Sequence, residues 1–242
     1  MVLPVHNEAS NVEFVVEEVF ERTRDWLDLR VIACEDGSDD GTQEVLAGLA
    51  TRFPLVIRSQ AQRRGYAGAV IDGLRAAESE WVLAMDADGQ CDPSDIRRLW
   101  SARGGVQVVI GHRQTRRDGP GRRAASGMFG LVYRALFHVT VSDPSCPLVL
   151  VRRADFSPLL DGLGRMPFGW WWEFVATAHR HGLKIAEAPI AHRPRRDGQT
   201  QVFLPRAMPR LALTQLAGLA RVWLATRRPK AQRASEKLPP CR

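Results

Sequence analysis

The sequence predicts an α/β fold in which helices cover both faces of a mainly parallel sheet. Short apolar runs alternate with stretches whose hydrophobic residues recur at helical spacing through residues 2–111. Turn and helix-start residues separate the two kinds of segment. The 242 residues are enough for one substantial domain whose core needs no disulfides. Regular alternation of this kind is typical of parallel sheets with helical crossovers.

The first half is expected to contain five strands and four helices. Each apolar run predicts a strand, and the periodic stretch after it predicts a helix. The expected strands are residues 2–5, 29–34, 55–58, 81–85 and 106–111. One expected helix begins at Val12, and three others span 43–52, 69–77 and 93–103. Ligands of such folds bind beyond the carboxyl ends of the strands. Polar residues that follow these strands are therefore the first candidates for a site.

The second half is less regular. It begins with an arginine-rich loop (113–123), an amphipathic helix (126–137) and a turn opened by an Asp-Pro pair (143–147). A further helix (171–181), a strand (184–190) and a basic loop (193–198) follow. We expect one domain over residues 1–203, an amphipathic segment over 204–226 and a basic, disordered tail over 227–242. Prolines and arginines interrupt the amphipathic segment, which suits a helix on an interface better than a membrane-spanning one. Contact with a membrane surface and packing on the domain both remain open.

The charge and cysteine content exclude several classes of protein. The formal charge is +7, and all but three of the 34 basic side chains are arginines, which suit phosphate recognition. No RNA-binding signature or DNA-reading motif is present, so we expect no nucleic-acid partner. No G-x-G-x-x-G follows the first strand, which disfavours a dehydrogenase. The four cysteines form no C-x-x-C pair, and polar residues directly follow the first strand, so we expect a cytoplasmic protein without a signal peptide.

Asp86 and Asp88 follow the apolar run 81–85. Two carboxylates at the end of one strand can reach a common divalent cation, and Mg²⁺ or Mn²⁺ takes oxygen ligands while leaving positions for phosphate oxygens. An isolated Asp-x-Asp is more often a solvated acidic turn. The buried strand before it and a second acidic cluster at 35–40 favour the metal interpretation.

Residues 35–42 (EDGSDDGT) form an acidic turn after the second strand. Gly37 permits a positive φ there, and Asp36 can accept hydrogen bonds from a nucleobase or ribose. Capping of the following helix by Ser38, Asp39 or Asp40 is an alternative that can hold at the same time.

With these patterns in place, residues 2–200 resemble the family 2 glycosyltransferases of GT-A fold, which is a Rossmann-like fold. Within that family they are most similar to the polyprenyl-phosphate (dolichol-phosphate) mannose or glucose synthases. The matching blocks are residues 3–8 (LPVHNE), 35–42 (EDGSDDGT), 64–69 (RGYAGA), 86–90 (DADGQ) and 143–146 (DPSC).

The resemblance assigns roles to individual residues. It implies a nucleotide pocket lined by Pro4, His6, Glu8 and Asp36, and a Mg²⁺ or Mn²⁺ ion held by Asp86, Asp88 and Gln90. It implies that Asp143 lies near the donor sugar, and that phosphates are bound by Arg117, Arg122, Arg123 and Arg195.

The implied reaction is an inverting transfer of a hexose from a GDP- or UDP-linked sugar to polyprenyl phosphate. The implied location is peripheral, on the inner face of the plasma membrane. The alternative is a hydroxyl acceptor in cell-envelope or polysaccharide synthesis, which needs a carboxylate base; Glu173 is the candidate, although a glutamate at the start of a helix or in an ion pair is as good an interpretation. Two departures weaken the assignment of sugar and acceptor: residues 147–149 are PLV where relatives have Gly-Phe-Arg, and Gln201 replaces a lysine.

Overall fold

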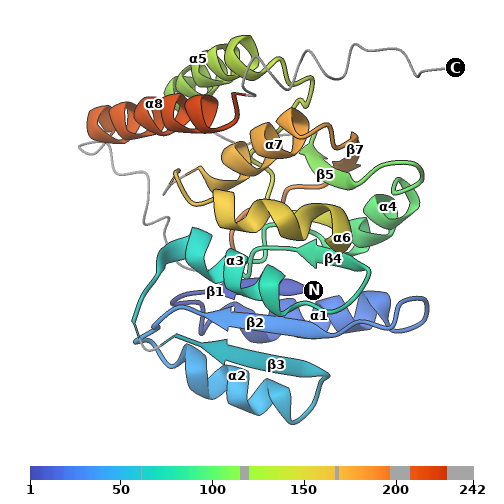
Figure 1. Ribbon diagram of the computed structural model, residues 1–242. Coiled ribbons are helices and arrows are strands. Elements are labelled where there is room, and N and C mark those ends of the chain that lie inside the picture. Colours follow the sequence, from blue (N-terminus) through green and yellow to red (C-terminus); the bar gives the residue numbers. More distant parts are fainter. Residues whose placement is uncertain (61, 115–119, 167–168, 197–207, 228–242) are drawn as a thin grey trace, which may run out of the picture.

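The computed structural model describes residues 1–60, 62–114, 120–166, 169–196 and 208–227 (Figure 1). Its centre is a seven-stranded sheet with the order β3-β2-β1-β4-β6-β5-β7. The strands are β1 (Val2–Val5), β2 (Val31–Glu35), β3 (Leu55–Ser59), β4 (Trp81–Ala84), β5 (Val108–Arg113), β6 (Val149–Arg152) and β7 (Ile185–Ile190). The predicted mainly parallel sheet is confirmed.

One strand runs against the others. β1 pairs in parallel with β2 and β4, β2 with β3, and β5 with β7, whereas β6 is antiparallel to both β4 and β5. The sequence prediction has no strand at β6, because its apolar run covers only Leu148–Val151 between a Pro-containing turn and two arginines. Tertiary pairing on both sides makes this short run a central strand.

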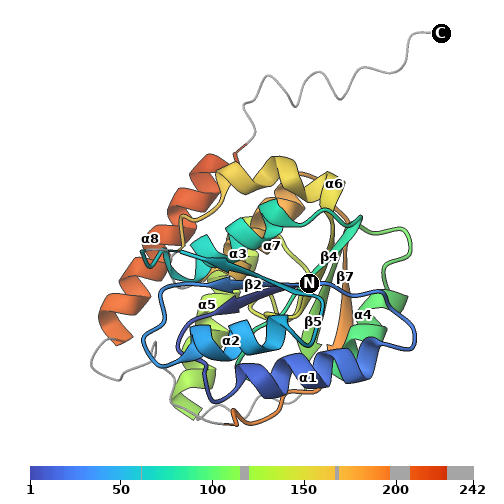
Figure 2. The ribbon, with the colours of Figure 1, turned by 90° about the horizontal axis from the view of Figure 1, so that it is seen from below.

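Helices cover both faces of the sheet. They are α1 (Val12–Thr23), α2 (Thr42–Ala50), α3 (Gly65–Ala76), α4 (Ile96–Ser101), α5 (Pro120–Phe137), α6 (Arg153–Phe156), α7 (Trp170–Arg180) and α8 (Met208–Ala225), with short 3₁₀ turns η1 (Pro93–Asp95) and η2 (Ser157–Gly162). Figure 2 shows α1, α2 and α4 on one side of the sheet and α3, α6 and α7 on the other. The helix expected over 93–103 is in fact η1 followed by α4, because Asp92 caps a 3₁₀ turn that begins at Pro93.

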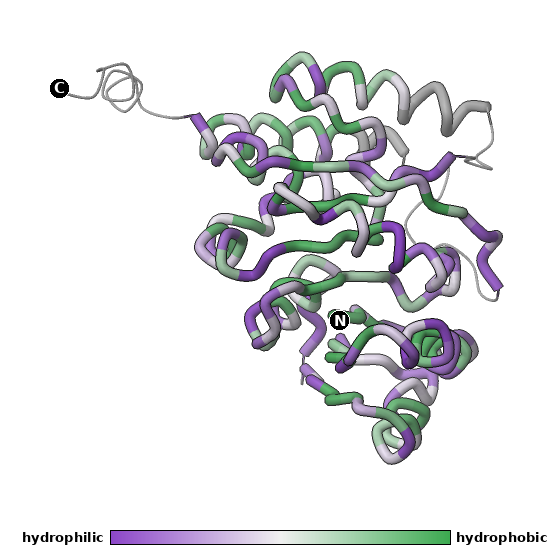
Figure 3. Tube along the Cα trace, turned by 90° about the vertical axis from the view of Figure 1, so that its right-hand side faces the viewer, coloured by the Kyte–Doolittle hydropathy of each residue, from purple (hydrophilic) through white to green (hydrophobic). Residues whose placement is uncertain are grey.

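The core lies on both faces of the central strands. Val2 and Leu3 of β1 are fully buried, as is Val31 of β2, which matches a strand covered on both sides. Hydrophobic residues accordingly run through the strands inside the molecule in Figure 3. At Gly73, α3 approaches β1 so closely that an added Cβ would lie 2.4 Å from Val2 Cγ1.

Helices α5 and α8 form the end of the molecule farthest from β3 (Figure 1). Each buries one side against the domain and exposes apolar residues on the other, including Met128 and Leu131 on α5 and Leu213 and Leu224 on α8. Helix α8 lies within the predicted amphipathic segment. None of the helices in the described ranges is long and apolar enough to cross a membrane. The segments 197–207 and 228–242 lie outside the described residues, so the domain boundaries stay predictions.

Candidate active site

The carboxyl ends of β1, β2 and β4 bring together most of the residues singled out in the sequence. These strands are neighbours in the sheet, and each is followed by one of the polar segments 6–8, 36–42 and 86–90. The turn after β4 is tight: Gly89 has a φ of +74°, and the backbone N–H of Gln90 donates to Asp88 Oδ1 at 3.0 Å. The polar segments singled out in the sequence therefore lie at one edge of the sheet, as expected.

Asp86 and Asp88 lie close enough to repel each other. Burial, together with the negative charge of Asp88, raises the pKa of the Asp86 carboxyl above its ordinary value. No group of three or more His, Cys, Asp or Glu side chains suited to a metal occurs within the described ranges. A cation here would be held by the carboxylate pair, and other oxygens would complete its coordination. The Gln90 amide nitrogen lies 3.5 Å from the carbonyl oxygen of Arg193.

Arg195 joins this carboxylate cluster from the far end of the chain. Its guanidinium pairs with Glu8 after β1, and its Nη1 lies 3.8 Å from Asp88 Oδ2. The loop that carries Arg195 is tied to the turn after β4, because the N–H of Arg193 donates to the Gln90 carbonyl at 2.9 Å. Burial raises the pKa of Glu8, while the hydrogen bond from Asn11 and the charge of Arg195 act in the opposite direction. The structure thus brings Glu8, Asp88 and Arg195 together across 187 residues of sequence.

Asp36 is 2% exposed and already has hydrogen-bond partners. Its Oδ1 accepts from the backbone N–H of Arg64 at 2.6 Å, and its Oδ2 accepts from that of Gly65 at 2.8 Å. Gly37 has a φ of +69°, as expected for this turn. In this arrangement Asp36 fixes the start of α3 beside the edge of the sheet.

The rest of the acidic turn holds the loop after β1. Asn7 has a φ of +54° and forms hydrogen bonds with Ser38 and Asp39. The next two backbone N–H groups also donate to this turn, that of Glu8 to Thr42 and that of Ala9 to Asp40. Asp40 also accepts from the backbone N–H of Thr42 at 3.1 Å, near the start of α2. The N-cap residue of α2 is Gly41, which forms no side-chain cap, so the expected capping of this helix by Ser38, Asp39 or Asp40 as its N-cap residue is wrong.

The first-strand residues differ in their surroundings. Pro4 is buried within β1, in register with Cys34 of β2. His6 directly follows β1, and its Nδ1 is buried without a hydrogen-bond partner among the residues that the structure describes. A buried polar atom without a partner is unusual and fits a contact with a bound molecule.

Asp143 forms a buried ion pair with Arg113, the last residue of β5. Arg113 Nε and Nη2 donate to the two oxygens of Asp143 at 2.6 and 2.8 Å, and Nη2 also donates to Ser145 at 2.7 Å. Burial acts to lower the pKa of Arg113, but the hydrogen bonds and charge of Asp143 outweigh it and raise that pKa. Arg113 also lies near enough to act on the charge of Asp86.

The remaining predicted arginines are not placed. Arg117 lies outside the described residues. Arg122 and Arg123 belong to the first turn of α5, where side chains are not described. Their assignment to phosphates stays a prediction.

Glu173 is fully buried at the start of α7 and binds the preceding loop. Its Oε2 accepts from the backbone N–H groups of Gly164 at 3.1 Å and Met166 at 2.9 Å, and its Oε1 lies 3.6 Å from Arg165 Nη1. These contacts match the interpretation as an ion-paired glutamate at a helix start. They leave Glu173 poorly placed to act as a base on an acceptor.

Tyr66 and Trp171 belong to the site and were not predicted individually. The Tyr66 hydroxyl donates to Asp86 Oδ1 at 2.6 Å, and Trp171 Nε1 donates to the Tyr66 oxygen at 2.7 Å. Tyr66 lies in the RGYAGA block, which was the only signal for it in the sequence. Trp171 is one of three adjacent tryptophans, and nothing in the sequence distinguishes it from Trp170 or Trp172.

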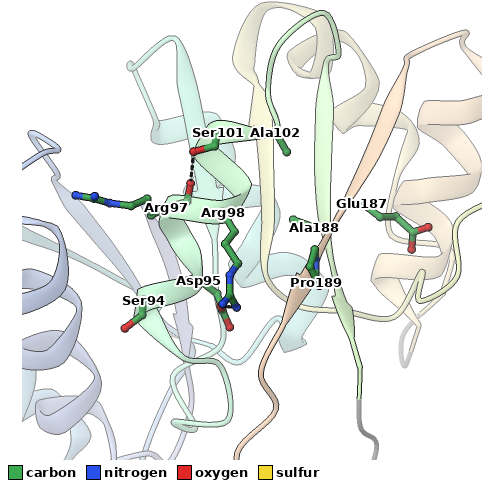
Figure 4. A pocket seen from close by; sticks show the side chains of 9 residues that line it. All are labelled: Ser94, Asp95, Arg97, Arg98, Ser101, Ala102, Glu187, Ala188 and Pro189. Atoms are coloured by element: carbon green, nitrogen blue, oxygen red, sulfur yellow. Dashed lines mark hydrogen bonds and ion pairs between the residues drawn. The ribbon is translucent and has the colours of Figure 1, made fainter.

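The described residues also form a cavity of about 570 Å³ between α4 and β7 (Figure 4). It is lined by Ser94, Asp95, Arg97, Arg98, Ser101, Ala102, Glu187, Ala188 and Pro189. None of the predicted site residues contributes to it.

The family follows from a direct comparison of the sequence. The family model for glycosyl transferase family 2 matches residues 1–159, well over half of the chain. The chain belongs to glycosyl transferase family 2. The resemblance seen in the sequence motifs is therefore confirmed.

Individual members of this family and solved structures of the same fold are also similar to the chain. Glycosyltransferase AglD of Haloferax volcanii is 28% identical over 85% of the chain, and an undecaprenyl-phosphate 4-deoxy-4-formamido-L-arabinose transferase of Pseudomonas paraeruginosa is 26% identical over 86%. The chain spans 34% and 61% of the lengths of these relatives. Glucosyl-3-phosphoglycerate synthase of Mycobacterium tuberculosis has a TM-score of 0.70 at 19% identity, covering 91% of this chain and 78% of that one. That likeness establishes the GT-A fold.

Proposed function

We propose that this family 2 glycosyltransferase transfers a hexose, with inversion, from a GDP- or UDP-linked sugar to polyprenyl phosphate. The observation that carries the proposal is the cluster of Asp86, Asp88, Glu8 and Arg195 at the carboxyl edge of the sheet. There the carboxylates can bind a metal ion, and the Arg195 guanidinium can bind the phosphates of a sugar diphosphate. The relatives named as undecaprenyl-phosphate transferases support the acceptor.

Asp86 and Asp88, with Gln90, are proposed to bind Mg²⁺ or Mn²⁺. The fit rests on the carboxylate pair itself: burial and the nearby charge of Asp88 raise the pKa of Asp86, and a cation between the two groups would relieve their repulsion. When bound, such an ion offsets the charge that builds up on the departing diphosphate. A solved glucosyl-3-phosphoglycerate synthase of the same fold contains Mn²⁺ and UDP-glucose, which supports a divalent cation.

The nucleotide is proposed to bind along β1 and β2. His6 offers its unpartnered Nδ1, and Pro4, Glu8, Asp36 and Gly37 form the neighbouring surface. Each oxygen of Asp36 accepts one backbone hydrogen bond at the start of α3, and a carboxylate oxygen can accept a second, so Asp36 can bind the nucleotide while it holds that segment.

The arginines are proposed to bind the phosphates of donor and acceptor. Arg195 is adjacent to the carboxylate pair, and Arg117, Arg122 and Arg123 precede or begin α5. Asp143, fixed by Arg113, is proposed to lie near the donor sugar. A lipid phosphate is already anionic, so its oxygen attacks the anomeric carbon as the bond to the diphosphate breaks, without a base. The buried contacts of Glu173 support this acceptor over a hydroxyl.

The acceptor is a membrane lipid, and we propose that α5 and α8 contact the membrane surface from the cytoplasmic side. Their exposed apolar residues support this, as does their charge: residues 120–137 and 208–225 contain five arginines and no aspartate or glutamate. Helices of this composition lie in an anionic lipid interface.

The test is transfer of labelled sugar from a panel of GDP- and UDP-sugars to a short polyprenyl phosphate, with Mg²⁺ or Mn²⁺ and with EDTA. We expect a glycolipid product that EDTA abolishes. Donor hydrolysis without a glycolipid would move the acceptor to a hydroxyl or another phosphate, and the absence of any metal-dependent reaction would contradict the proposed function.

The metal assignment has its own variant. Asp88→Asn removes a charged ligand, so we expect turnover to fall roughly a hundredfold or more at low Mn²⁺. Asp161→Asn is the matched control, because Asp161 is 91% exposed and pairs only with Arg75 at the surface among the described residues. Near-normal turnover of Asp88→Asn would refute the assignment.

A further inference from the structure

A chain of two hydrogen bonds joins helix α7 to the carboxylate pair. Trp171 Nε1 lies 2.7 Å from the Tyr66 hydroxyl oxygen, and that oxygen lies 2.6 Å from Asp86 Oδ1. The three residues come from α7, α3 and the turn after β4, which are far apart in the sequence. Neither the matched sequence motifs nor the proposed function gives Tyr66 or Trp171 a role.

The chemistry of the two donors fixes the direction of the chain. An indole N–H can only donate, so the Tyr66 oxygen must accept from Trp171. The hydroxyl has a single proton, and that proton is therefore directed to Asp86 Oδ1. One oxygen of Asp86 is held in place by this bond, and the other can turn toward a cation.

Both ends of this chain are anchored. Trp171 is 6% exposed, and the centroid of its ring lies 4.5 Å from that of the Trp170 ring and 5.5 Å from that of the Phe174 ring. On the other side, Asp36 accepts from the backbone N–H of Gly65, the residue before Tyr66. Tyr66 is thus held by its backbone and by its hydroxyl, so it can restrict the rotation of the Asp86 carboxylate.

We propose that Tyr66 and Trp171 are positioning residues that orient Asp86 for binding of a divalent cation and a nucleoside diphosphate. The inference rests on the proposed function, since it requires Asp86 to be a metal ligand. Partners that orient a metal ligand through a hydrogen bond typically contribute about 10- to 100-fold to metal affinity. Tyr66 donates directly to the ligand, so its hydroxyl should matter more than the Trp171 indole.

The test measures Mn²⁺ binding in the presence of UDP or GDP, by titration calorimetry and by the electron paramagnetic resonance signal of free Mn²⁺. Tyr66→Phe removes only the hydroxyl, and we expect about tenfold weaker Mn²⁺ binding. Trp171→Phe should weaken binding less. The double variant should bind about as weakly as Tyr66→Phe alone, because Trp171 acts through the hydroxyl that this variant lacks.

The chain contains matched controls for both substitutions. Tyr133 in α5 is the only other tyrosine in the sequence. The Tyr133 hydroxyl donates at 2.9 Å to the carbonyl oxygen of Trp172, the residue after Trp171 in α7, and not to Asp86. Trp26 also donates through its indole nitrogen, to the carbonyl oxygen of Arg22 at 2.8 Å, and it has no part in the chain that ends at Asp86. Tyr133→Phe and Trp26→Phe should leave Mn²⁺ affinity unchanged, and thermal unfolding of all variants separates affinity from folding.

The outcomes distinguish the inference from the function on which it rests. Wild-type Mn²⁺ affinity in Tyr66→Phe overturns the positioning role and leaves the metal assignment intact. Equal losses in Tyr66→Phe and Tyr133→Phe indicate a general effect on packing and also overturn it. A wild-type protein that binds no Mn²⁺ with either nucleotide removes Asp86 as a metal ligand and the inference with it.

Discussion

The buried ion pair between Arg113 and Asp143 tests the site at the scale of single residues. Its side chains are 11% and 5% exposed, and the two hydrogen bonds between them leave little room for water. Asp143→Asn keeps the shape but removes the charge that Arg113 requires. We expect the free energy of unfolding to fall by about 3 kcal/mol, because an uncompensated charge stays buried. Urea denaturation measures the change.

The control for this prediction is an exposed ion pair. Arg52 is 49% exposed and pairs with Glu13 and Glu17 between α2 and α1. Arg52→Gln should cost less than about 1 kcal/mol, because water already screens these charges. If Asp143→Asn costs no more than Arg52→Gln, the pair does not stabilise this part of the site.

Sequence motifs point to the residues proposed to carry the chemistry and miss those that hold them. Asp86 and Asp88 could be singled out because a buried strand precedes them and a second acidic cluster lies at 35–40, which together favour a metal site over a solvated turn. Arg195 could be predicted from a family pattern, although only the fold brings it to Glu8 and Asp88. Tyr66 and Trp171 could not, because their roles depend on a contact between residues 105 positions apart.

At the scale of elements, α3 provides a pair of opposite predictions. In Gly73→Ala the new Cβ would lie 2.4 Å from Val2 Cγ1 and 2.6 Å from Cys34 Sγ, so α3 must move away from β1 and β2. We expect a loss of about 1–3 kcal/mol in the free energy of unfolding. The new Cβ of Gly48→Ala in α2 would meet no described atom within 4 Å, so this variant should gain about 0.5–1 kcal/mol from the helical preference of alanine.

Thermal or urea unfolding of the two variants checks the sign as well as the size. Both changes add one methyl group to a helix, so intrinsic helix preference affects them equally. A gain in both variants would mean that α3 does not pack on β1 as closely as described. A loss in both would mean that Gly48 also has a packing role.

The same element scale explains which parts of the fold could be predicted. β1 to β5 follow from apolar runs and turn residues, and their bounds differ from the prediction by at most two residues. β6 could not be predicted, because a run of four apolar residues directly after Pro147 becomes a strand only where β4 and β5 pair with it. The start of α3 at Gly65 was also missed. The N–H groups of Arg64 and Gly65 find their acceptors on Asp36, which directly follows β2 and lies far away in the sequence.

At the scale of the whole molecule, α5 and α8 combine a net positive charge with exposed apolar side chains at one end. We expect the protein to float with vesicles that contain phosphatidylglycerol and to bind phosphatidylcholine vesicles weakly. Each arginine or lysine near an anionic surface contributes about 1 kcal/mol, and salt screens this attraction over about 8 Å at physiological ionic strength. Binding should therefore fall steadily as NaCl is raised.

Apolar contact is tested separately by Leu131→Gln, which changes a side chain that is 65% exposed on α5. Loss of its transfer to lipid should reduce vesicle binding by about 1 kcal/mol, roughly fivefold, at every salt concentration. Val56→Gln is the control, because Val56 is 58% exposed on β3, at the opposite end of the molecule (Figure 1). If both variants bind vesicles as the wild-type protein does, charge alone holds the molecule at the surface. If Val56→Gln weakens binding as much as Leu131→Gln, the end formed by α5 and α8 is not the docking surface.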